Sequence, residues 1–305
     1  MQWDHLNIAV LLPCFNEEGA IGHTVIDFKQ QLPQATIYVY DNNSTDNTIA
    51  EAKAAGAIVR KETRQGKGEV VRRMFADVDA DIYVMADGDE TYDTSAIPIL
   101  LDTLLNEHVD MVIGTRSTPV EAYPKGHILG NRLFSTLINK FFNASLSDVF
   151  SGYRVMTKRF VKTIPIMSDG FQIETELTVH ALHHKIPILE VPTIYKPRPE
   201  GTKSKLRTYS DGFKILRFII FLIRDVKPLL FFSFLFLLSS ITSLMLGTPI
   251  IIEFVLTGLV PKFPTAILAS SIGIISITCL FTGLILDNVS RGRMENKINN
   301  YKSIT

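Results

Sequence analysis

Cysteine is scarce in this sequence, and neither sign of charge is in excess. The 305 residues include only Cys14 and Cys279, which argues against a disulfide framework and indicates a reducing compartment. The chain has 31 lysines and arginines and 31 aspartates and glutamates. Because these charges cancel, no global field attracts nucleic acid, and we do not expect nucleic acid as a partner.

The start of the sequence also lacks the basic and apolar sections of a secretion signal. From residue 7 to about residue 193, short apolar runs alternate with helical periodicity, which is typical of an α/β domain with a mostly parallel sheet. Enrichment in Val, Ile and Tyr predicts strands at residues 8–12, 36–40, 57–59, 82–86, 111–114 and 188–191. Ser44 is expected to cap a helix that ends before Gly56. We expect this domain to stay in the cytoplasm.

Long uncharged runs are confined to the C-terminal third. Residues 229–246 and 265–286 contain no charge, and each run is long enough to cross a hydrocarbon core of about 30 Å. Residues 208–227 have a charged face and an apolar face, which favours an amphipathic helix in the membrane interface over a helix packed on the sheet. Residues 248–260 include Glu253 and are too short to span, so an interfacial and a re-entrant path are both open.

Basic residues flank the two uncharged runs on their outer sides, whereas the connection holds only Lys262. This distribution predicts that both termini face the cytoplasm. We therefore expect a cytoplasmic domain over residues 1–207, an interfacial helix over 208–227, and an anchor in the inner or plasma membrane over 228–305. Small side chains that would allow close helix packing leave a homo-oligomer open; they are Ser239, Ser240, Gly273 and Ser276.

The strongest chemical signal is the pair Asp87 and Asp89, which follows the apolar run 82–86 with one glycine between the two carboxylates. Hard cations such as Mg²⁺ prefer oxygen ligands and complete their shell with water and phosphate oxygens. The pair therefore indicates a metal that carries a phosphate. Other polar residues follow strands at 13–18, 41–46 and 115–116, where ligands of a doubly wound sheet bind, although helix capping would also explain some of them.

The loop around Gly66, Lys67 and Gly68 matches neither common nucleotide motif. It lacks the third glycine of a dinucleotide fingerprint, and no Ser or Thr follows Lys67 as a P-loop requires. Its glycines either let backbone approach a nucleotide or form a flexible turn. Glu174 and Glu176 either shape a pocket or lie on a helix surface, and we expect structural or surface roles for the histidines His127, His180, His183 and His184.

Taken in order, four motifs resemble a family 2 glycosyltransferase of GT-A fold. They are Leu12-Pro13-Cys14-Phe15-Asn16-Glu17, Asp41-Asn42-Asn43-Ser44-Thr45-Asp46, Gly66-Lys67-Gly68 and Asp87-Gly88-Asp89. Later runs are similar to the polyprenyl-phosphate branch of that family, which includes dolichol-phosphate mannose synthases. These runs are Gly114-Thr115-Arg116, Gly130-Asn131-Arg132 with Ser135, Asp148 with Ser151-Gly152-Tyr153-Arg154, and Arg198 with Ser204-Lys205.

The resemblance implies a Rossmann-like GT-A domain and a role for each matching residue. Pro13, Glu17 and Asp41 would hold the base and ribose of a nucleotide-sugar donor. Asp87 and Asp89 would manage its diphosphate through Mg²⁺ or Mn²⁺, with Arg198 and Lys205 over the diphosphate. Arg116, Arg132 and Ser135 would grip the phosphate of a polyprenyl-phosphate acceptor beside the bilayer. Further candidates for binding are Asn16, Lys67 and Ser204.

One position departs from the family pattern. Relatives with a glutamine two residues after the second aspartate use it at the metal, whereas this sequence has Thr91 there, within residues 90–93. The remaining metal ligand is therefore open. Base, sugar and prenyl selectivity depend on the shape of the pocket, which the motifs do not specify.

Three functions compete at this point. The leading hypothesis is inverting sugar transfer from a UDP- or GDP-sugar to undecaprenyl or dolichyl phosphate, giving a lipid-linked sugar for cell-envelope glycans. A processive polysaccharide synthase is disfavoured because those enzymes carry Gln-x-x-Arg-Trp, and the single tryptophan here is Trp3. A non-catalytic scaffold, or a helper in translocation of lipid-linked sugars, is the third possibility.

Overall fold

The computed structural model describes residues 3–117, 125–197 and 208–304, without the side chains of residues 125–133, 208–215 and 219. Arg198, Ser204 and Lys205 lie outside the described residues, as does the side chain of Arg132. The chain forms two compact units. Unit 1 comprises residues 1–216 with 298–305, and unit 2 comprises residues 217–297.

Unit 1 is built on a mostly parallel sheet. Its described strands are β1 (Ile8–Cys14), β2 (Thr36–Asp41), β3 (Ile58–Lys61), β4 (Ile82–Met85), β5 (Met111–Ser117), β6 (Arg154–Thr157) and β7 (Ile188–Ile194). Their order is β3-β2-β1-β4-β6-β5-β7, and β6 runs antiparallel to both of its neighbours. The six predicted strands are all present. The sequence analysis missed β6, because four residues that begin with an arginine show no strand-like run.

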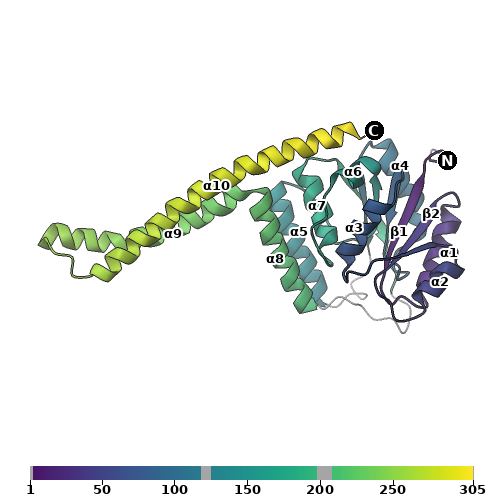
Figure 1. The fold of residues 1–305 in the computed structure, drawn as a ribbon, viewed down its shortest axis with the longest axis horizontal. Coiled ribbons are helices and arrows are strands. Elements are labelled where there is room, and N and C mark those ends of the chain that lie inside the picture. The colour runs from purple at the N-terminus through teal and green to yellow at the C-terminus, as the bar shows by residue number, and fades with distance from the viewer. Residues whose placement is uncertain (1–2, 118–124, 198–207, 305) are drawn as a thin grey trace. The chain divides into compact units, whose positions relative to one another are not determined.

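Helices cover both faces of this sheet (Figure 1). The described helices of the domain are α1 (Ile21–Gln31), α2 (Thr48–Ala54), α3 (Lys67–Asp77), α4 (Ile97–Asn106), α5 (Lys125–Phe142), α6 (Lys158–Thr163) and α7 (Ile173–His183), with a 3-10 turn η1 at Thr94–Ala96. Alternate residues of β1 belong to different cores: Val10 joins the core that includes residues of α1, α2 and α4, and Leu11 joins the core that includes residues of α3, α6 and α7. The central strand is therefore buried on both faces, as parallel sheets require.

The predicted start of α2 was wrong. The helix begins at Thr48, and Asp46 rather than Ser44 accepts the Thr48 amide at 3.0 Å. Ser44 instead accepts the amide of Asn16 at 2.9 Å, in the loop after β1. A serine that precedes a helix can satisfy any nearby amide, and the neighbouring loop provides one here. The predicted stop before Gly56 is confirmed, because α2 ends at Ala54 and Gly56 has a φ of 85°.

Unit 2 holds two helices that are long and apolar enough to cross a membrane, α9 (Pro228–Thr257) and α10 (Phe263–Ser303). They follow α8 (Thr208–Val226), as the sequence predicts. Small residues bring α9 and α10 together: the hydroxyls of Ser240 and Ser276 are 3.0 Å apart, and Ser243 donates to the carbonyl of Ala269 at 2.8 Å. Some of the small side chains considered for oligomer packing are thus used inside the chain.

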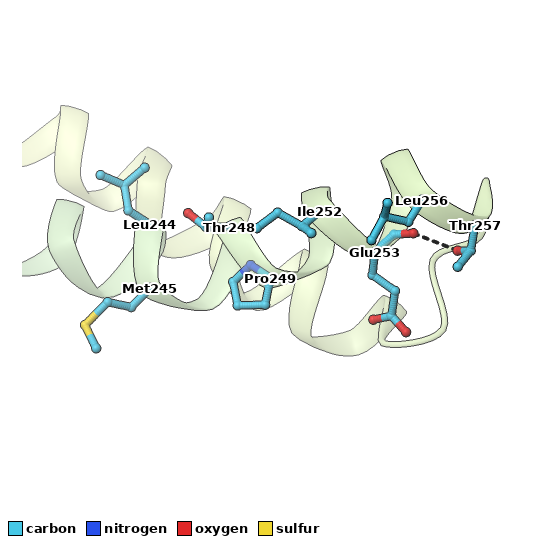
Figure 2. A pocket seen from close by; sticks show the side chains of 8 residues that line it. All are labelled: Leu244, Met245, Thr248, Pro249, Ile252, Glu253, Leu256 and Thr257. Atoms are coloured by element: carbon cyan, nitrogen blue, oxygen red, sulfur yellow. Dashed lines mark hydrogen bonds between the residues drawn. The ribbon is translucent and has the colours of Figure 1, made fainter.

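Most of residues 248–260 are helical. Most of them continue α9 through Pro249 to Thr257, and Gly258 ends the helix in the left-handed region with a φ of 68°. Glu253 lies in a hollow along α9 together with Leu244, Met245, Ile252 and other apolar residues (Figure 2). This hollow includes none of the polar residues that the sequence analysis selected as site candidates.

The last residues of α10 belong to unit 1, where Tyr301 meets a buried carboxylate. The Tyr301 hydroxyl donates to Asp110, which is fully buried. Asp110 also accepts from Thr157 at 2.7 Å and from Arg159 at 2.9 Å, and the Arg159 guanidinium lies 4.5 Å from the centre of the Tyr301 ring. These contacts fasten the C-terminal turn to the ends of β5 and β6.

We predict that Tyr301→Phe loosens this turn. Deleting a hydrogen bond to a buried carboxylate costs about 1–3 kcal/mol, so amide exchange in residues 298–303 should accelerate and the melting temperature of the purified protein should fall. Ser303→Ala removes only a bond within the helix, to the Asn300 carbonyl, and serves as the control. Equal exchange rates in the two variants would contradict the prediction.

Candidate active site

The loops after β1 and β2 are joined by hydrogen bonds. The amide of Glu17 donates to the hydroxyl of Thr48 at 2.8 Å, and the amide of Thr45 donates to the side-chain oxygen of Asn16 at 2.8 Å. Asn16 adopts a φ of 53°, which turns the chain back toward β2. Two predicted donor-binding residues, Asn16 and Glu17, therefore lie beside the loop that begins at Asp41.

Asp41 lies at the carboxyl end of β2, directly beside the end of β1. Pro13 pairs with Tyr40 and Cys14 pairs with Asp41 in the parallel register. Asp41 is fully buried, and its two carboxylate oxygens each accept the amide of Ser44 at 3.3 Å. The structure thus brings together Pro13, Glu17 and Asp41 at one edge of the sheet, as the parallel strands predicted.

The two glycines around Lys67 serve a purpose that the sequence analysis did not consider. A Cβ on either Gly66 or Gly68 would overlap a backbone carbonyl of the loop at Ser168 and Asp169. The Gly68 amide donates to the Asp169 carbonyl at 3.0 Å, and Gly66 has a φ of 140°. The glycines therefore let the start of α3 pack against a loop about a hundred residues away in sequence.

This packing places Lys67 between two carboxylates. Its ammonium forms an ion pair with Asp87, at the end of β4, and lies 2.5 Å from the carboxylate of Glu174, in the first turn of α7. Burial alone lowers the pKa of Lys67, but Asp87 and Glu174 outweigh burial and raise it. The lysine is therefore a fixed positive charge, and Gly152 completes its surroundings: a Cβ there would lie 3.2 Å from Asp87 and 3.3 Å from the lysine.

Asp89, the second carboxylate of the turn, is almost fully buried. Its side chain accepts the hydroxyl of Thr91 at 2.5 Å and the amide of Thr91 at 3.3 Å. Thr91 is itself buried, and its carbonyl accepts the amide of Lys196 at 2.7 Å. The residue that replaces the family's glutamine thus orients Asp89.

The oxygen ligands that the turn of Asp87 and Asp89 offers fit a hard divalent cation. Asp87 and Asp89 offer carboxylate oxygens from one turn, and no three Asp, Glu, His or Cys side chains cluster as metal ligands among the described residues. Mg²⁺ and Mn²⁺ suit such a site, because hard cations held by two carboxylates take their other oxygens from water and phosphate. Asp93, which could have been a ligand, instead caps η1 by accepting the Ser95 amide at 3.2 Å.

The rings of three tyrosines, Tyr92, Tyr153 and Tyr195, pack together near the carboxylates. The rings of Tyr92 and Tyr195 are 5.4 Å apart, and those of Tyr92 and Tyr153 are 5.0 Å apart. The Tyr92 hydroxyl accepts the amide of Gly152 at 2.9 Å. Burial and the nearby charge of Asp89 raise the pKa of Tyr195, against the smaller effect of its contact with the Thr91 side chain, so its phenol stays neutral.

Arg116, predicted to grip the acceptor phosphate, is held by Asp148. Two of its nitrogens bind the carboxylate at 2.7 and 2.8 Å, and the guanidinium lies 5.6 Å from the centre of the Tyr195 ring. Asp148 is itself held in place, because its backbone amide donates to the carboxylate of Glu190 at 3.0 Å. Arg116 is therefore held next to Tyr195. Ser135, the other described residue that was predicted to bind the acceptor, is buried in α5.

Arg154 is a fully buried arginine that holds backbone segments next to the site. Its guanidinium donates to the carbonyls of Ser151 and Val149 at 2.9 and 3.0 Å, and to the carbonyl of Glu174 at 2.8 Å. Burial lowers the pKa of Arg154 to about 10, although the charges of Glu174 and Asp148 oppose this shift. The arginine thus ties the segment from Val149 to Ser151 to the start of α7.

The surface interpretation of Glu174 and Glu176 was wrong, because both are buried. Glu176 accepts the amides of Met167 and Ser168 at 2.8 and 2.9 Å and has a structural role. His180 lies 3.6 Å from Glu176, which agrees with a structural histidine. Glu174 could not be assigned from sequence, because only the fold brings it to Lys67.

Two further residues could have been found by the strand rule. Tyr195 directly follows β7, which is parallel to β5, so its position beyond a carboxyl end marks it as a site residue. Tyr92 follows the turn at Asp89 and forms an isolated bridge with Tyr195.

The sequence pattern described as Glycosyl transferase family 2 matches residues 9–164. The chain belongs to this family. This glycosyltransferase is 32% identical over 255 residues to glycosyltransferase AglJ of Haloferax volcanii, covering 83% of this chain and 84% of AglJ. It is 29% identical over 215 residues to a dolichyl-phosphate hexose transferase of the same organism, covering 70% and 92% of the two chains.

The solved structures place the glycosyltransferase among GT-A folds. Glucosyl-3-phosphoglycerate synthase from Mycobacterium tuberculosis, solved with Mn²⁺, UDP and phosphoglyceric acid, has a TM-score of 0.59 and 21% identity. The match covers 73% of this chain and 79% of that one. The predicted GT-A domain is therefore confirmed, together with a tail of two apolar helices.

We predict that Gly68→Ala destabilises the glycosyltransferase, whereas Gly22→Ala does not. Each glycine is the second residue of its helix, but an added Cβ would overlap the Ser168 carbonyl at Gly68 and would lie 3.9 Å from Glu51 at Gly22. Alanine gains up to about 1 kcal/mol in a helix, and a forced backbone shift costs roughly 1–3 kcal/mol. Thermal unfolding should therefore show a lower melting temperature for Gly68→Ala only. A similar melting temperature for both variants would contradict this.

Proposed function

We propose that this enzyme transfers a sugar, with inversion, from a UDP- or GDP-sugar to a polyprenyl phosphate at the cytoplasmic face of a membrane. The observation that carries the proposal is the turn of Asp87 and Asp89 beside the buried ammonium of Lys67. Two carboxylates suit a metal and a fixed lysine suits a diphosphate. The dolichyl-phosphate hexose transferase relative supports the lipid acceptor, and α9 and α10 support a membrane location.

The residues of the enzyme have to manage charge on the leaving diphosphate. A divalent cation bound by Asp87 and Asp89, Mg²⁺ or Mn²⁺, would supply positive charge there. Lys67 would add a second positive charge beside the diphosphate, because Glu174 already holds its ammonium in the site. Arg198, Ser204 and Lys205 remain predicted contributors on the donor side.

The acceptor requires orientation more than activation. A phosphate monoester with a second pKa near 6 is mostly dianionic at neutral pH, so its oxygen can attack the anomeric carbon without a general base. Arg116 lies next to Tyr195 and is rigidly oriented by Asp148. We propose that Arg116, together with Arg132 and Ser135, binds the phosphate of the lipid.

We predict that Asp89→Asn abolishes formation of a sugar-phosphoryl lipid. Purified protein is incubated with Mn²⁺, undecaprenyl phosphate and a panel of UDP- and GDP-sugars, and products are identified by mass spectrometry. Removing one charge-stabilising group costs about 100-fold or more in rate. Asp79→Asn is the control, because Asp79 is exposed and its carboxylate pairs with Lys158 on the surface, away from the acidic turn.

Other outcomes point to other functions. Long glycan products would indicate a processive synthase. Donor and metal binding without any glycosylated lipid would refute the proposed acceptor. Full activity of Asp89→Asn in cells would favour a non-catalytic scaffold or a translocation helper.

A further inference from the structure

The ion pair of Lys67 and Asp87 involves a residue that the metal would also need. The ammonium reaches the carboxylates of both Asp87 and Glu174, and these two partners differ in exposure. The Asp87 side chain is 28% exposed, whereas those of Lys67 and Glu174 are 12% and 5% exposed. Asp87 is therefore the partner that an incoming ligand can reach.

Glu174 is the fixed partner. It lies in the first turn of α7, where the helix dipole stabilises a carboxylate. Its backbone carbonyl accepts the buried guanidinium of Arg154 at 2.8 Å, which anchors the turn that carries it. Glu174 would keep hold of the lysine if Asp87 were engaged elsewhere.

A metal cation that approaches the turn of Asp87 and Asp89 without a nucleotide competes with Lys67 for Asp87. It must share Asp87 with an ammonium that is largely shielded from solvent, and a charge in that position is costly to leave without a partner. A diphosphate that approaches with the cation removes the conflict, because its oxygens provide the ammonium with a new negative partner. Lys67 therefore opposes the metal alone and favours the metal with its nucleotide.

We propose that Lys67, held by Glu174, makes metal binding depend on the donor: it occupies Asp87 in the free enzyme and turns to the diphosphate when the nucleotide-sugar arrives. Glu174 acts as a positioning residue, through the lysine. This inference rests on the proposed use of a metal and a nucleotide-sugar, and it adds an ordered, cooperative assembly of the two. Such an assembly would keep the acidic turn from holding free cations.

The test is direct binding of Mn²⁺ to the full-length protein, by electron paramagnetic resonance, with and without UDP or GDP. In the natural enzyme, nucleotide should tighten Mn²⁺ binding strongly. In Lys67→Met, Mn²⁺ alone should bind about tenfold more tightly, and the tightening by nucleotide should shrink by a similar factor, within the range usual for coupled sites. Lys158→Met is the control, because it removes a half-buried lysine of the same domain whose carboxylate partner is Asp79 rather than Asp87 or Glu174.

Glu174→Gln tests whether Glu174 acts by positioning Lys67 or only through its own negative charge. On its own it should weaken binding of Mn²⁺, because Lys67 is left with Asp87 alone. In the Lys67→Met background it should have no further effect. Additive effects in the double variant would overturn the role of Glu174, since long-range charge effects add.

The two proposals fail in different ways. If the natural enzyme binds Mn²⁺ and nucleotide together and Lys67→Met retains the full coupling, the inference is wrong and the proposed function stands. If no nucleotide binds to the natural enzyme with Mn²⁺, both are wrong. Melting curves of each variant, with Lys67→Arg as a charge-preserving substitution that should keep Mn²⁺ binding weak, show whether a change reflects misfolding.

Discussion

The buried ammonium of Lys67, between Asp87 and Glu174, is the interaction on which the site depends. It links α3 and the end of β4 to the start of α7, which is far from both in sequence. A buried ion pair stabilises little on balance, because desolvation offsets its attraction. Its value here is specificity: one lysine fixes the position of a carboxylate that we propose as a metal ligand.

Backbone packing makes that ion pair possible. Lys67 reaches Asp87 because Gly66 and Gly68 allow α3 to begin directly against the carbonyls of Ser168 and Asp169. Any side chain at these glycines would push the helix start away. The glycines therefore act on the site by setting the position of the start of α3. They do not form a P-loop, because Lys67 is followed by Gly68 rather than by Ser or Thr.

Much of the sheet could be predicted from the sequence, for a clear physical reason. The strands β1, β2 and β4 are apolar because both of their faces are buried, and that pattern needs no knowledge of the fold. The same strands predicted that Asp41, Asp87 and Asp89 lie at the carboxyl ends of parallel strands, on one edge of the sheet. β6 was missed because it opens with Arg154, whose charge is satisfied by carbonyls that only the folded chain supplies.

Contacts between distant segments set the limit of prediction at the site. Glu174 was recognised as a candidate but its partner was not, because no spacing in the sequence connects it with Lys67. Likewise, residues 248–260 were separated from the uncharged run 229–246 because they hold Glu253 and are short, yet α9 continues through Pro249 to Thr257. An apolar helix can keep a proline when neighbouring groups tolerate the lost backbone bond, and a window without charge therefore underestimates its length.

Thr91 shows how the acidic turn can work without the family's glutamine. Its hydroxyl and amide both bind one carboxylate oxygen of Asp89, so the residue fixes the direction of a ligand rather than adding one. A turn that contributes only two carboxylates leaves most of a metal's coordination sphere to other oxygens. In the proposed function a diphosphate would supply those oxygens, so such a turn would hold a bare cation weakly. The replacement of the glutamine by Thr91 and the ion pair of Lys67 with Asp87 would then act in the same direction, because both would make the donor part of the metal site.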